Sequence, residues 1–362
     1  NNLFKTTSSI IIMNCIINQN GRLGGISCWF SSNITIKSNT FLHNGIYLYG
    51  NRLSHYASHT IENNTVNGRP LYYIVDVIGP LSAPSDAGQI IIVNSTHIKL
   101  TNANLSCTDA GLEIAYAKDV YIKHCLISQN LIGISCLYSS SISISDCTIS
   151  NNTWHITPHG ILCLYSSSIS ISDCAISNNM WIGIGIYSSC IISVVNCTVS
   201  NNMWIGVGCY DSSCVTIKDC SFIHNGVVLC GYQLSHFASH VIENNTVNGK
   251  SLYYIVNVTG PYDVPSDAGQ AIIVNSMHVR LTNANLSYTD VGLEIIYSSN
   301  ITINDCEVDQ NGVGIYCMNS SGIAIHYCNI YGNRYHGLYN DGEYVVNATY
   351  CWWGSPNGPE YK

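Results

Sequence analysis

The sequence predicts an all-β fold, a parallel β-helix built from stacked turns of one repeated unit. Three observations lead to this prediction: short segments of alternating apolar and polar residues, a repeat of about 22–25 residues, and corners rich in asparagine and serine. Similar copies of the unit stand at Ser139–Asn152, Ser166–Asn179 and Ser188–Asn202. Runs of three to five residues with period two are typical of strands, not helices. Each turn can bury its apolar face only by stacking on its neighbours.

One position of the repeat, directly after a corner residue that is usually Asp or Asn, aligns in fourteen successive turns, so about 14 turns are expected. Asn-rich corners suit left-handed backbone conformations, and stacked Asn side chains can form amide ladders. The aligned residues are Cys15, Asn39, Asn64, Ala103, Cys125, Cys147, Cys174, Cys197, Cys220, Asn245, Ala284, Cys306, Cys328 and Cys351.

A larger duplication is superimposed on the short repeat. Residues 31–153 align with residues 212–334 at a constant offset of 181. The chain is therefore divided into a first seven-turn half, residues 1–181, and a second, residues 182–362, in one continuous solenoid. Each half carries the same inserted loop, Leu71–Gln89 and Leu252–Gln270, which we expect on one side of the rod.

The composition excludes several classes of protein. Only 9% of residues are charged and the net charge is −8, so there is no basic footprint for nucleic acid. The apolar runs are too short for a membrane span. Asn1–Lys5 has no initiator Met and is interpreted as a processed or internal start.

Two features favour an oxidising, extracellular location: 18 cysteines and twelve Asn-x-Ser/Thr sequons. The candidate glycosylation sites are Asn33, Asn63, Asn94, Asn104, Asn151, Asn196, Asn244, Asn257, Asn285, Asn300, Asn319 and Asn347.

Longer motifs carry a family resemblance. The segment NNTVNGRPLYYIV (Asn63–Val75), its copy at Asn244–Val256, the stretch Asp86–Ser106 and the ending Cys351–Pro359 resemble secreted right-handed parallel β-helix proteins. These are the NosD-like, pectin-lyase-like surface proteins of archaeal type. The resemblance implies a right-handed solenoid. It does not fix a function, because members include surface-layer and adhesin components, carbohydrate-active enzymes and a periplasmic protein linked to copper-site maturation.

The acidic residues do not form a catalytic cluster. Asp146, Asp173, Asp219 and Asp305 all occupy the same corner of the repeat, as expected for corner formers. No catalytic residue and no cofactor is therefore assigned, and the chain is expected not to be an enzyme. The alternative is a carbohydrate-binding or carbohydrate-cleaving β-helix that uses acids of the inserted loops, such as Asp86 or Asp267.

A duplicated histidine motif provides a second alternative, a NosD-like copper- or zinc-binding protein. Pairs of histidines four residues apart, each followed by a glutamate, are candidate metal ligands. The competing interpretation is a polar cover on the neighbouring strand. The residues are His55, His59 and Glu62 in the first half, and His236, His240 and Glu243 in the second.

Most cysteines fall on two columns with inward parity, where a thiol acts as a small hydrophobic side chain. Adjacent turns bring Cα atoms to about 4.8 Å, so some column pairs could be bridged. Cys190 and Cys214 precede strands of successive turns and are the best disulfide candidates.

Aromatic residues recur near the same positions of several turns, and we expect them to pack rather than to bind sugars. They are Tyr138, Tyr165, Tyr187, Trp154, Trp181 and Trp204.

The function predicted first is structural. A near-neutral surface, an N-terminal turn without a capping helix and a duplicated solenoid indicate an assembly subunit. We therefore expect a secreted, N-glycosylated cell-surface protein that stacks end to end into a filament, sheath or layer, with other copies of itself and covalent glycans as partners.

Overall fold

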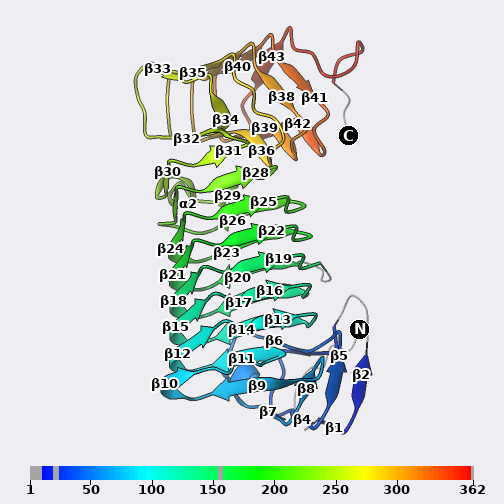
Figure 1. The fold of residues 1–362 in the computed structure, drawn as a ribbon. Helices are drawn as coiled ribbons and strands as arrows, with labels where there is room; N and C mark the ends of the chain where they lie inside the picture. The colour runs from blue at the N-terminus through cyan, green and yellow to red at the C-terminus, as the bar shows by residue number, and fades with distance from the viewer. Residues whose placement is uncertain (1–9, 19–23, 154–157, 360–362) are drawn as a thin grey trace. The chain divides into compact units, whose positions relative to one another are not determined.

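The predicted all-β parallel β-helix is confirmed. The computed structural model describes residues 10–18, 24–153 and 158–359; Asn1–Lys5 and Trp154, both singled out above, lie outside them. The described chain consists almost entirely of short strands with two four-residue helices (Figure 1). In this part of the chain, no helix has the length and apolar character needed to cross a membrane. Two compact units, Asn1–Cys197 and Thr198–Lys362, are described separately.

The first unit begins with a short solenoid segment, defined here as residues 10–66, followed by a longer segment, residues 69–197. The elements of the short segment are β1 (Ile11–Met13), β2 (Ile16–Asn18), β3 (Ile26–Trp29), β4 (Thr35–Lys37), β5 (Thr40–Leu42), β6 (Ile46–Tyr49), α1 (Ser54–Ala57), β7 (Thr60–Glu62) and β8 (Thr65–Val66). Those of the longer segment are β9 (Arg69–Val75), β10 (Ile78–Ser82), β11 (Gln89–Val93), β12 (Thr96–Thr101), β13 (Asn104–Ser106), β14 (Ala110–Ala115), β15 (Lys118–Lys123), β16 (Leu126–Ser128), β17 (Ile132–Leu137), β18 (Ser140–Ser145), β19 (Thr148–Ser150), β20 (His159–Leu164), β21 (Ser167–Ser172), β22 (Ala175–Ser177), β23 (Ile182–Tyr187) and β24 (Cys190–Val195).

Strands of equal position in successive turns pair in parallel and in register. Along β12, β15, β18 and β21, the residues Ile98, Val120, Ile142 and Ile169 lie directly above one another. All four are buried, as the period-two pattern requires for the face that points inward. The core of the longer segment is therefore a set of aliphatic stacks inside the turns.

The corners use the left-handed backbone region, as the sequence predicts. The corner Asp and Asn residues have positive φ values, for example 52° at Asp146, 54° at Asp173 and 52° at Asn196. Asn and Asp tolerate this region better than other residues with a Cβ. Asp219 and Asp305 adopt it in the second unit, with φ of 54° and 52°. These aspartates are corner formers.

Buried polar side chains at the corners form ladders between turns. The backbone N–H of Asn130 donates to Oδ1 of Asn152 at 3.0 Å, and Nδ2 of Asn152 donates to Oδ1 of Asn179 at 2.8 Å. Serines form a second ladder, in which the N–H of Ser139 donates to Oγ of Ser166 at 3.1 Å. Each ladder supplies a partner to backbone groups that turn away from the strand pairing.

A hairpin separates the two segments of the first unit. Strands β8 and β9 pair antiparallel around Asn67-Gly68, whose φ values are 50° and 77°. Positive φ at both central residues is typical of a two-residue hairpin turn. The segment marked as an insertion, residues 71–89, contains most of β9 and the whole of β10. The hairpin thus reverses the strand direction between β8 and β9 within one continuous sheet.

Buried side chains of the longer segment cap the free edge of β6, which pairs with β3 on its other side. Oε1 of Gln89 accepts the Ile46 N–H at 2.9 Å, and Oε2 of Glu113 accepts the Leu48 N–H at 3.2 Å. Asp109 accepts the Gly25 N–H at 2.8 Å. These three side chains take the place of a neighbouring strand, and we call them the acid latch of the first unit.

The second unit repeats this architecture. A short segment, residues 198–247, ends in an antiparallel hairpin between β31 and β32 around Asn248-Gly249. The elements are β25 (Thr198–Ser200), β26 (Ile205–Tyr210), β27 (Thr216–Lys218), β28 (Ser221–Ile223), β29 (Val227–Cys230), α2 (Ser235–Ala238), β30 (Val241–Glu243), β31 (Thr246–Val247), β32 (Lys250–Val256), β33 (Tyr262–Val264), β34 (Ala268–Val274), β35 (Val279–Thr282), β36 (Val291–Ile296), β37 (Thr302–Asn304), β38 (Glu307–Asp309), β39 (Val313–Met318), β40 (Ile323–His326), β41 (Asn329–Tyr331), β42 (His336–Asp341) and β43 (Val346–Thr349).

The acid latch of the second unit consists of Gln270, Asp290 and Glu294. Oε1 of Gln270 accepts the Val227 N–H at 3.0 Å, and Oε2 of Glu294 accepts the Leu229 N–H at 3.3 Å. Asp290 is held more tightly: its Oδ2 accepts the N–H groups of two glycines, 206 and 226, each at 2.7 Å. One carboxyl group thereby ties two turns of the short segment to the start of β36.

Burial raises the pKa of the latch carboxyls. Burial raises the pKa of Asp109 to about 7 and that of Asp290 to about 7, although backbone N–H donors oppose the shift. The pKa values of Glu113 and Glu294 are raised well above the ordinary range by the same cause. All four groups favour the neutral form inside the fold, because the charged form is poorly solvated there.

We predict that the protein loses stability as the pH rises from about 4 through 7. The folded state binds protons at Asp109 and Asp290 more tightly than the unfolded chain does, so the free energy of unfolding falls as these protons are released. Urea unfolding at a series of pH values measures the slope. The Asp109→Asn and Asp290→Asn variants should flatten it; a wild-type stability that rises across this interval would contradict the prediction.

We also predict that Asn152→Ala destabilises the fold by about 1–3 kcal/mol, because it leaves the buried N–H of Asn130 without its acceptor. Chemical unfolding followed by circular dichroism measures the loss. Asn18→Ala is the control, since Asn18 is exposed on β2 and should cost less than about 0.5 kcal/mol. Equal losses in the two variants would refute a stabilising role for the ladder.

Candidate functional site

The histidine motifs lie in and after the helices α1 and α2, where hydrogen bonds occupy the second histidine of each pair. Nδ1 of His59 accepts the Ile34 N–H at 3.3 Å, and Nε2 lies 3.0 Å from the carbonyl of His55. Both ring nitrogens of His59 are therefore engaged, and burial lowers its pKa. His240 repeats this geometry with Val215, at 3.2 Å, and with His236, at 2.8 Å.

The glutamates of the same motifs form ion pairs with lysines of the preceding turn. Glu62 lies 3.1 Å from Lys37, and Glu243 lies 2.9 Å from Lys218. Within residues 10–18, 24–153 and 158–359, no group of three or more His, Cys, Asp or Glu side chains is placed to hold a metal ion. The arrangement links neighbouring turns through the histidine and glutamate side chains.

The acids of the inserted segments accept hydrogen bonds from nearby tyrosines. Asp86 accepts the Tyr72 hydroxyl at 3.2 Å, and Asp267 accepts the hydroxyls of Tyr253 and Ser251, each at 2.8 Å. The hydrogen bonds from Tyr253 and Ser251 lower the pKa of Asp267. These carboxylates are exposed and belong to separate units.

The structure contains no disulfide: the 18 cysteines all lie in the described residues and are free thiols. The interpretation of the column cysteines as buried thiols fits the structure, and the possible bridging of some column pairs is not found. Parallel strands in register keep neighbouring Cβ atoms about 4.8 Å apart, whereas a disulfide needs about 3.8 Å. Of the candidate pair, Cys190 is partly buried at the start of β24 in the first unit, and Cys214 is exposed in the second.

The twelve candidate glycosylation asparagines are all exposed to solvent, at corners or on outward strand positions.

The recurring aromatic residues differ in their contacts. Tyr138 and Tyr165 stack on each other at 5.1 Å between ring centroids, whereas Tyr187 contacts His159 at 3.1 Å. Packing therefore accounts for these tyrosines, while Trp204 takes part in a pocket.

A pocket of about 290 Å³ lies in the second unit where its short and longer segments meet. Trp204 and His224 come from turns of the short segment, and Tyr288, Arg334 and Tyr335 come from turns of the longer one. The ring centroids of His224 and Tyr288 lie 6.0 Å apart across this boundary, with the ring planes tilted by 45°. The hairpin residue Asn248 fixes the boundary, because its Nδ2 donates to the Tyr288 carbonyl at 2.9 Å.

Arg334 closes one side of the pocket. Its Nη1 donates to the Met203 carbonyl at 3.3 Å, and its guanidinium lies 5.3 Å from the ring centroid of Tyr335. On the opposite segment, Nδ1 of His224 lies 2.9 Å from Oδ1 of Asn201. The pocket therefore offers a cation, an imidazole and three aromatic rings to one ligand.

Asp290 of the acid latch is the only acidic residue among those that line this pocket. It is buried, and its carboxyl oxygens accept hydrogen bonds from the N–H groups of Gly206 and Gly226 and from Asn225 at 3.1 Å. Asp290 thus belongs to both the acid latch and the pocket. Its hydrogen bonds between the short and longer segments hold this part of the pocket wall in place.

Sequence reasoning missed this pocket, although the duplication contains a signal for it. At the offset of 181, Tyr288 and Arg334 correspond to Cys107 and Thr153 of the first half, whereas Asp290 corresponds to Asp109. The second half therefore keeps the latch and adds an aromatic ring and a guanidinium beside it. Positions at which the two similar halves differ were therefore the signal in the sequence that could have located the pocket.

Comparison with solved structures finds other β-helices. The periplasmic alginate epimerase AlgG is 12% identical over 96% of this chain and 79% of its own, with a TM-score of 0.39. The A-module of mannuronan C-5 epimerase AlgE6 from Azotobacter vinelandii is 10% identical over 96% and 91%, with a TM-score of 0.36. PfbA, a surface adhesin of Streptococcus pneumoniae, is 12% identical over 83% of each chain, with a TM-score of 0.38. No curated protein matches the sequence.

This comparison corrects the expectation that the chain is not an enzyme. Most of the structures compared are enzymes, among them the two epimerases, a GH87 α-1,3-glucanase and a DFA-IIIase. Identities of 10–12% describe a shared fold only, so no residue or substrate is transferred from them.

The family described as the right-handed β-helix region matches residues 83–213, 159–266 and 256–353, which together cover most of the sequence. The strand order, the in-register parallel pairing and the stacked corners agree with this match. The chain therefore belongs to the right-handed β-helix family.

Proposed function

We propose that this protein is a carbohydrate-active β-helix that binds a saccharide in the pocket of the second unit. The observation that carries the proposal is the grouping of Trp204, Tyr288 and Tyr335 with Arg334 and His224 around one cavity. Aromatic rings present apolar faces on which sugar rings pack, while the polar groups orient the hydroxyls.

Charge favours an acidic saccharide over a neutral one. Arg334 is exposed and makes a single hydrogen bond to a backbone carbonyl, so donors of its guanidinium remain for a carboxylate or sulfate. The acid of the pocket, Asp290, is buried and favours its neutral form, so it offers little repulsion to an anion. An anionic sugar ring bound between Arg334 and the aromatic side chains would pair with the guanidinium and would meet no charged carboxylate in the pocket.

The same pocket contains groups for acid–base chemistry. His224 is exposed at the boundary, and Asp290 has a pKa raised to about 7 by burial. An imidazole and a neutral carboxyl group beside a bound ligand can serve as general base and general acid. Two carboxylates flanking a glycosidic bond are not available among the lining residues, so a hydrolytic pair is not proposed. Chemistry at this site would instead use the imidazole of His224 as a base beside a sugar carboxylate neutralised by Arg334.

We predict that Arg334→Thr and Tyr288→Cys, which restore the residues of the first half, weaken binding of acidic polysaccharide about tenfold or more. Calorimetric titration with uronic-acid and neutral oligosaccharides measures the effect. The control is Tyr327→Ala, because Tyr327 is exposed and stacks on Tyr350 outside the pocket. Unchanged affinity in both pocket variants would rule the pocket out as the saccharide site.

Catalysis is tested separately by incubating the protein with the polysaccharide that it binds. Chromatography of the products, together with absorbance of the unsaturated sugar that an elimination would create, detects turnover. We expect His224→Asn to abolish product formation while affinity changes less than fivefold, because a base acts on the bound substrate. Binding without any product would define the protein as a binding module.

Self-association at the cell surface is a second candidate function, supported by the exposed strands of the first turn. Ile11 of β1 and Ile16 of β2 are 65% and 75% exposed, which is unusual for aliphatic residues on paired strands. Exposure of all twelve sequon asparagines is compatible with an extracellular glycoprotein. In this second proposal, copies of the chain stack end to end through such edges.

The association candidate predicts a concentration-dependent rise in mass by light scattering, reduced by Ile16→Lys. A charged residue on an edge strand opposes edge-to-edge pairing. Val345→Lys is the matched surface control, since Val345 is 84% exposed outside the strands. A protein that stays monomeric at high concentration would exclude this candidate.

A further inference from the structure

The outward face of one parallel sheet in the first unit differs in composition between neighbouring turns. Strands β12, β15, β18 and β21 pair in register, and their inward positions are aliphatic. On β18 and β21 the outward positions carry serines, such as Ser143, which pairs with Ser170. The matching positions of β12 and β15 carry Lys99, Tyr121 and Lys123 instead. We call these three residues the lysine face.

An exposed aromatic ring stands between the two cations of this face. Tyr121 is 52% exposed, and Lys99 is its partner in the strand register, about 4.8 Å away in the preceding turn. Lys123 follows two residues later on the same strand, about 7 Å along it. A sugar ring packed on Tyr121 would therefore have a flexible ammonium side chain on two sides.

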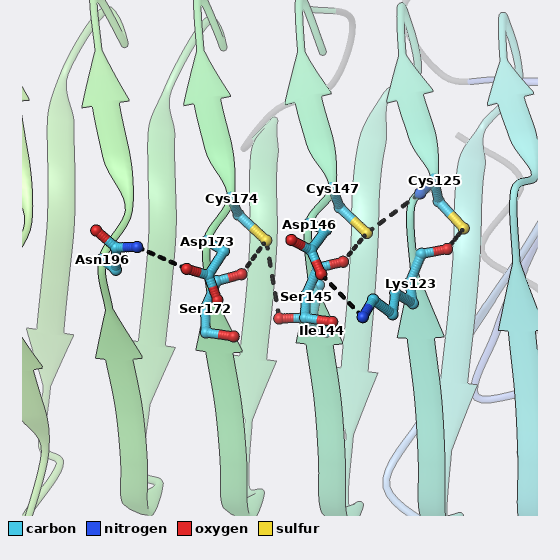
Figure 2. A network of polar contacts seen from close by, with 10 residues as sticks. All are labelled: Lys123, Cys125, Ile144, Ser145, Asp146, Cys147, Ser172, Asp173, Cys174 and Asn196. Atoms are coloured by element: carbon cyan, nitrogen blue, oxygen red, sulfur yellow. Dashed lines mark hydrogen bonds and ion pairs between the residues drawn. The ribbon is translucent and has the colours of Figure 1, made fainter.

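The charges of the lysine face are only partly neutralised. Lys123 extends toward the corner of the next turn, where its ammonium lies 3.3 Å from Asp146 (Figure 2). Both partners of this ion pair are exposed, so the pair is weak and an anionic ligand can replace Asp146. Lys99 and Lys118, the first residue of β15, form no ion pair with the part of the chain that the structure describes.

Acidic residues are scarce around the face. Within β12, β15, β18 and β21, all of which the structure describes, Asp119 is the single acid, and it lies 3.7 Å from His97. At the neighbouring corners, Asp173 accepts a hydrogen bond from Nδ2 of Asn196 at 2.6 Å (Figure 2). The serines of β18 and β21 add hydroxyl groups beside the lysines. The face therefore offers cations and hydrogen-bonding groups to an anionic ligand, with little repulsion.

The duplicated half lacks the ring and one of the cations. At the offset of 181, Tyr121 and Lys123 correspond to Thr302 and Asn304, which lie on β37. The strand framework is the same in both halves, so neither the tyrosine nor the lysine is needed to form it. These side chains are therefore available for a role other than folding.

The remaining cation is neutralised in the second half and free in the first. Lys99 corresponds to Arg280, whose Nε and Nη2 donate to the carboxylate of Asp263 at 2.7 and 3.0 Å. Asp263 corresponds to Ser82, which is the register neighbour of Lys99. The first unit thus keeps the cation and has a hydroxyl where the second unit has the neutralising acid.

We propose that the lysine face is a docking surface for an acidic polysaccharide. Carboxylate or sulfate groups of the bound chain pair with Lys99 and Lys123, and one of its sugar rings packs on Tyr121. Negative charge recurs along such a chain, so one chain can meet both ammonium groups. The surface holds the polymer without acting on it chemically. The proposal does not depend on the saccharide pocket, because the two sites share no residue.

Calorimetric titration with polygalacturonate, a chain of uronic acids, tests the proposal. The Arg334→Thr variant is the background, so that binding in the pocket contributes as little as possible. We expect an affinity that falls as salt is added, because the paired charges are exposed. The double variant Tyr121→Thr, Lys123→Asn carries the residues of the second half and should bind about tenfold more weakly, since a ring contact and a charged contact are lost.

The substitution Ser82→Asp makes a smaller change with a matched control. Its carboxylate lies beside Lys99 in the strand register and should weaken binding severalfold, whereas Ser82→Asn should not. Lys218→Ala controls for total charge, because Lys218 pairs with Glu243 in the second unit. Equal affinities of the two Ser82 variants, or a loss in Lys218→Ala as large as in the double variant, would overturn the proposal.

Lysine acetylation of the wild-type protein gives a measurement that does not depend on the folding of any variant. Bound polygalacturonate should slow acetylation of Lys99 and Lys123 severalfold relative to Lys218, as mapped by mass spectrometry. Equal protection of all three lysines, or of none, would contradict docking at this face. Duplex DNA is the alternative polyanion: if it binds as tightly as polygalacturonate and is weakened equally by the double variant, the assignment to polysaccharide is wrong.

Discussion

The parallel, in-register hydrogen bonding between successive turns is the constraint on which the rest of this structure depends. It places equal positions of the repeat directly above one another, so that every inward residue is packed against its own counterpart. An apolar residue such as Ile142 then extends an aliphatic stack. A buried polar residue such as Asn152 must find its partner in the next turn. The low charge and the abundance of asparagine follow from this rule, because neutral amides satisfy both sides of a ladder.

The stacking rule ends where a hairpin interrupts the solenoid, and there other side chains replace the missing strand. Gln89 and Glu113 in the first unit, and Gln270 and Glu294 in the second, accept the N–H groups of an otherwise unpaired strand edge. These groups are buried, and burial raises the pKa of the two glutamates, which makes the junctions sensitive to pH. The buried carboxyls of the protein with raised pKa values therefore lie at these junctions.

The two units show how one framework acquires the pocket for which we propose a saccharide ligand. Both carry an aspartate that ties glycine N–H groups to the longer segment, but the second unit adds Tyr288 and Arg334 where the first has Cys107 and Thr153. These substitutions place an aromatic ring and a guanidinium beside an existing junction.

The sequence by itself determined the fold class, the left-handed corners at residues such as Asp146 and the asparagine ladders, because a period of about 22 residues fixes which positions stack. It also contained the hairpin signal Asn67-Gly68, which lies inside the longer motif Asn63–Val75 and was not interpreted as a turn. Only the tertiary structure decided that thiols stay free, that Asp290 serves both a junction and a pocket, and that Trp204 meets Arg334. The physical reason is that periodicity specifies contacts between neighbouring turns, whereas the packing of one segment against another depends on contacts that no repeat encodes.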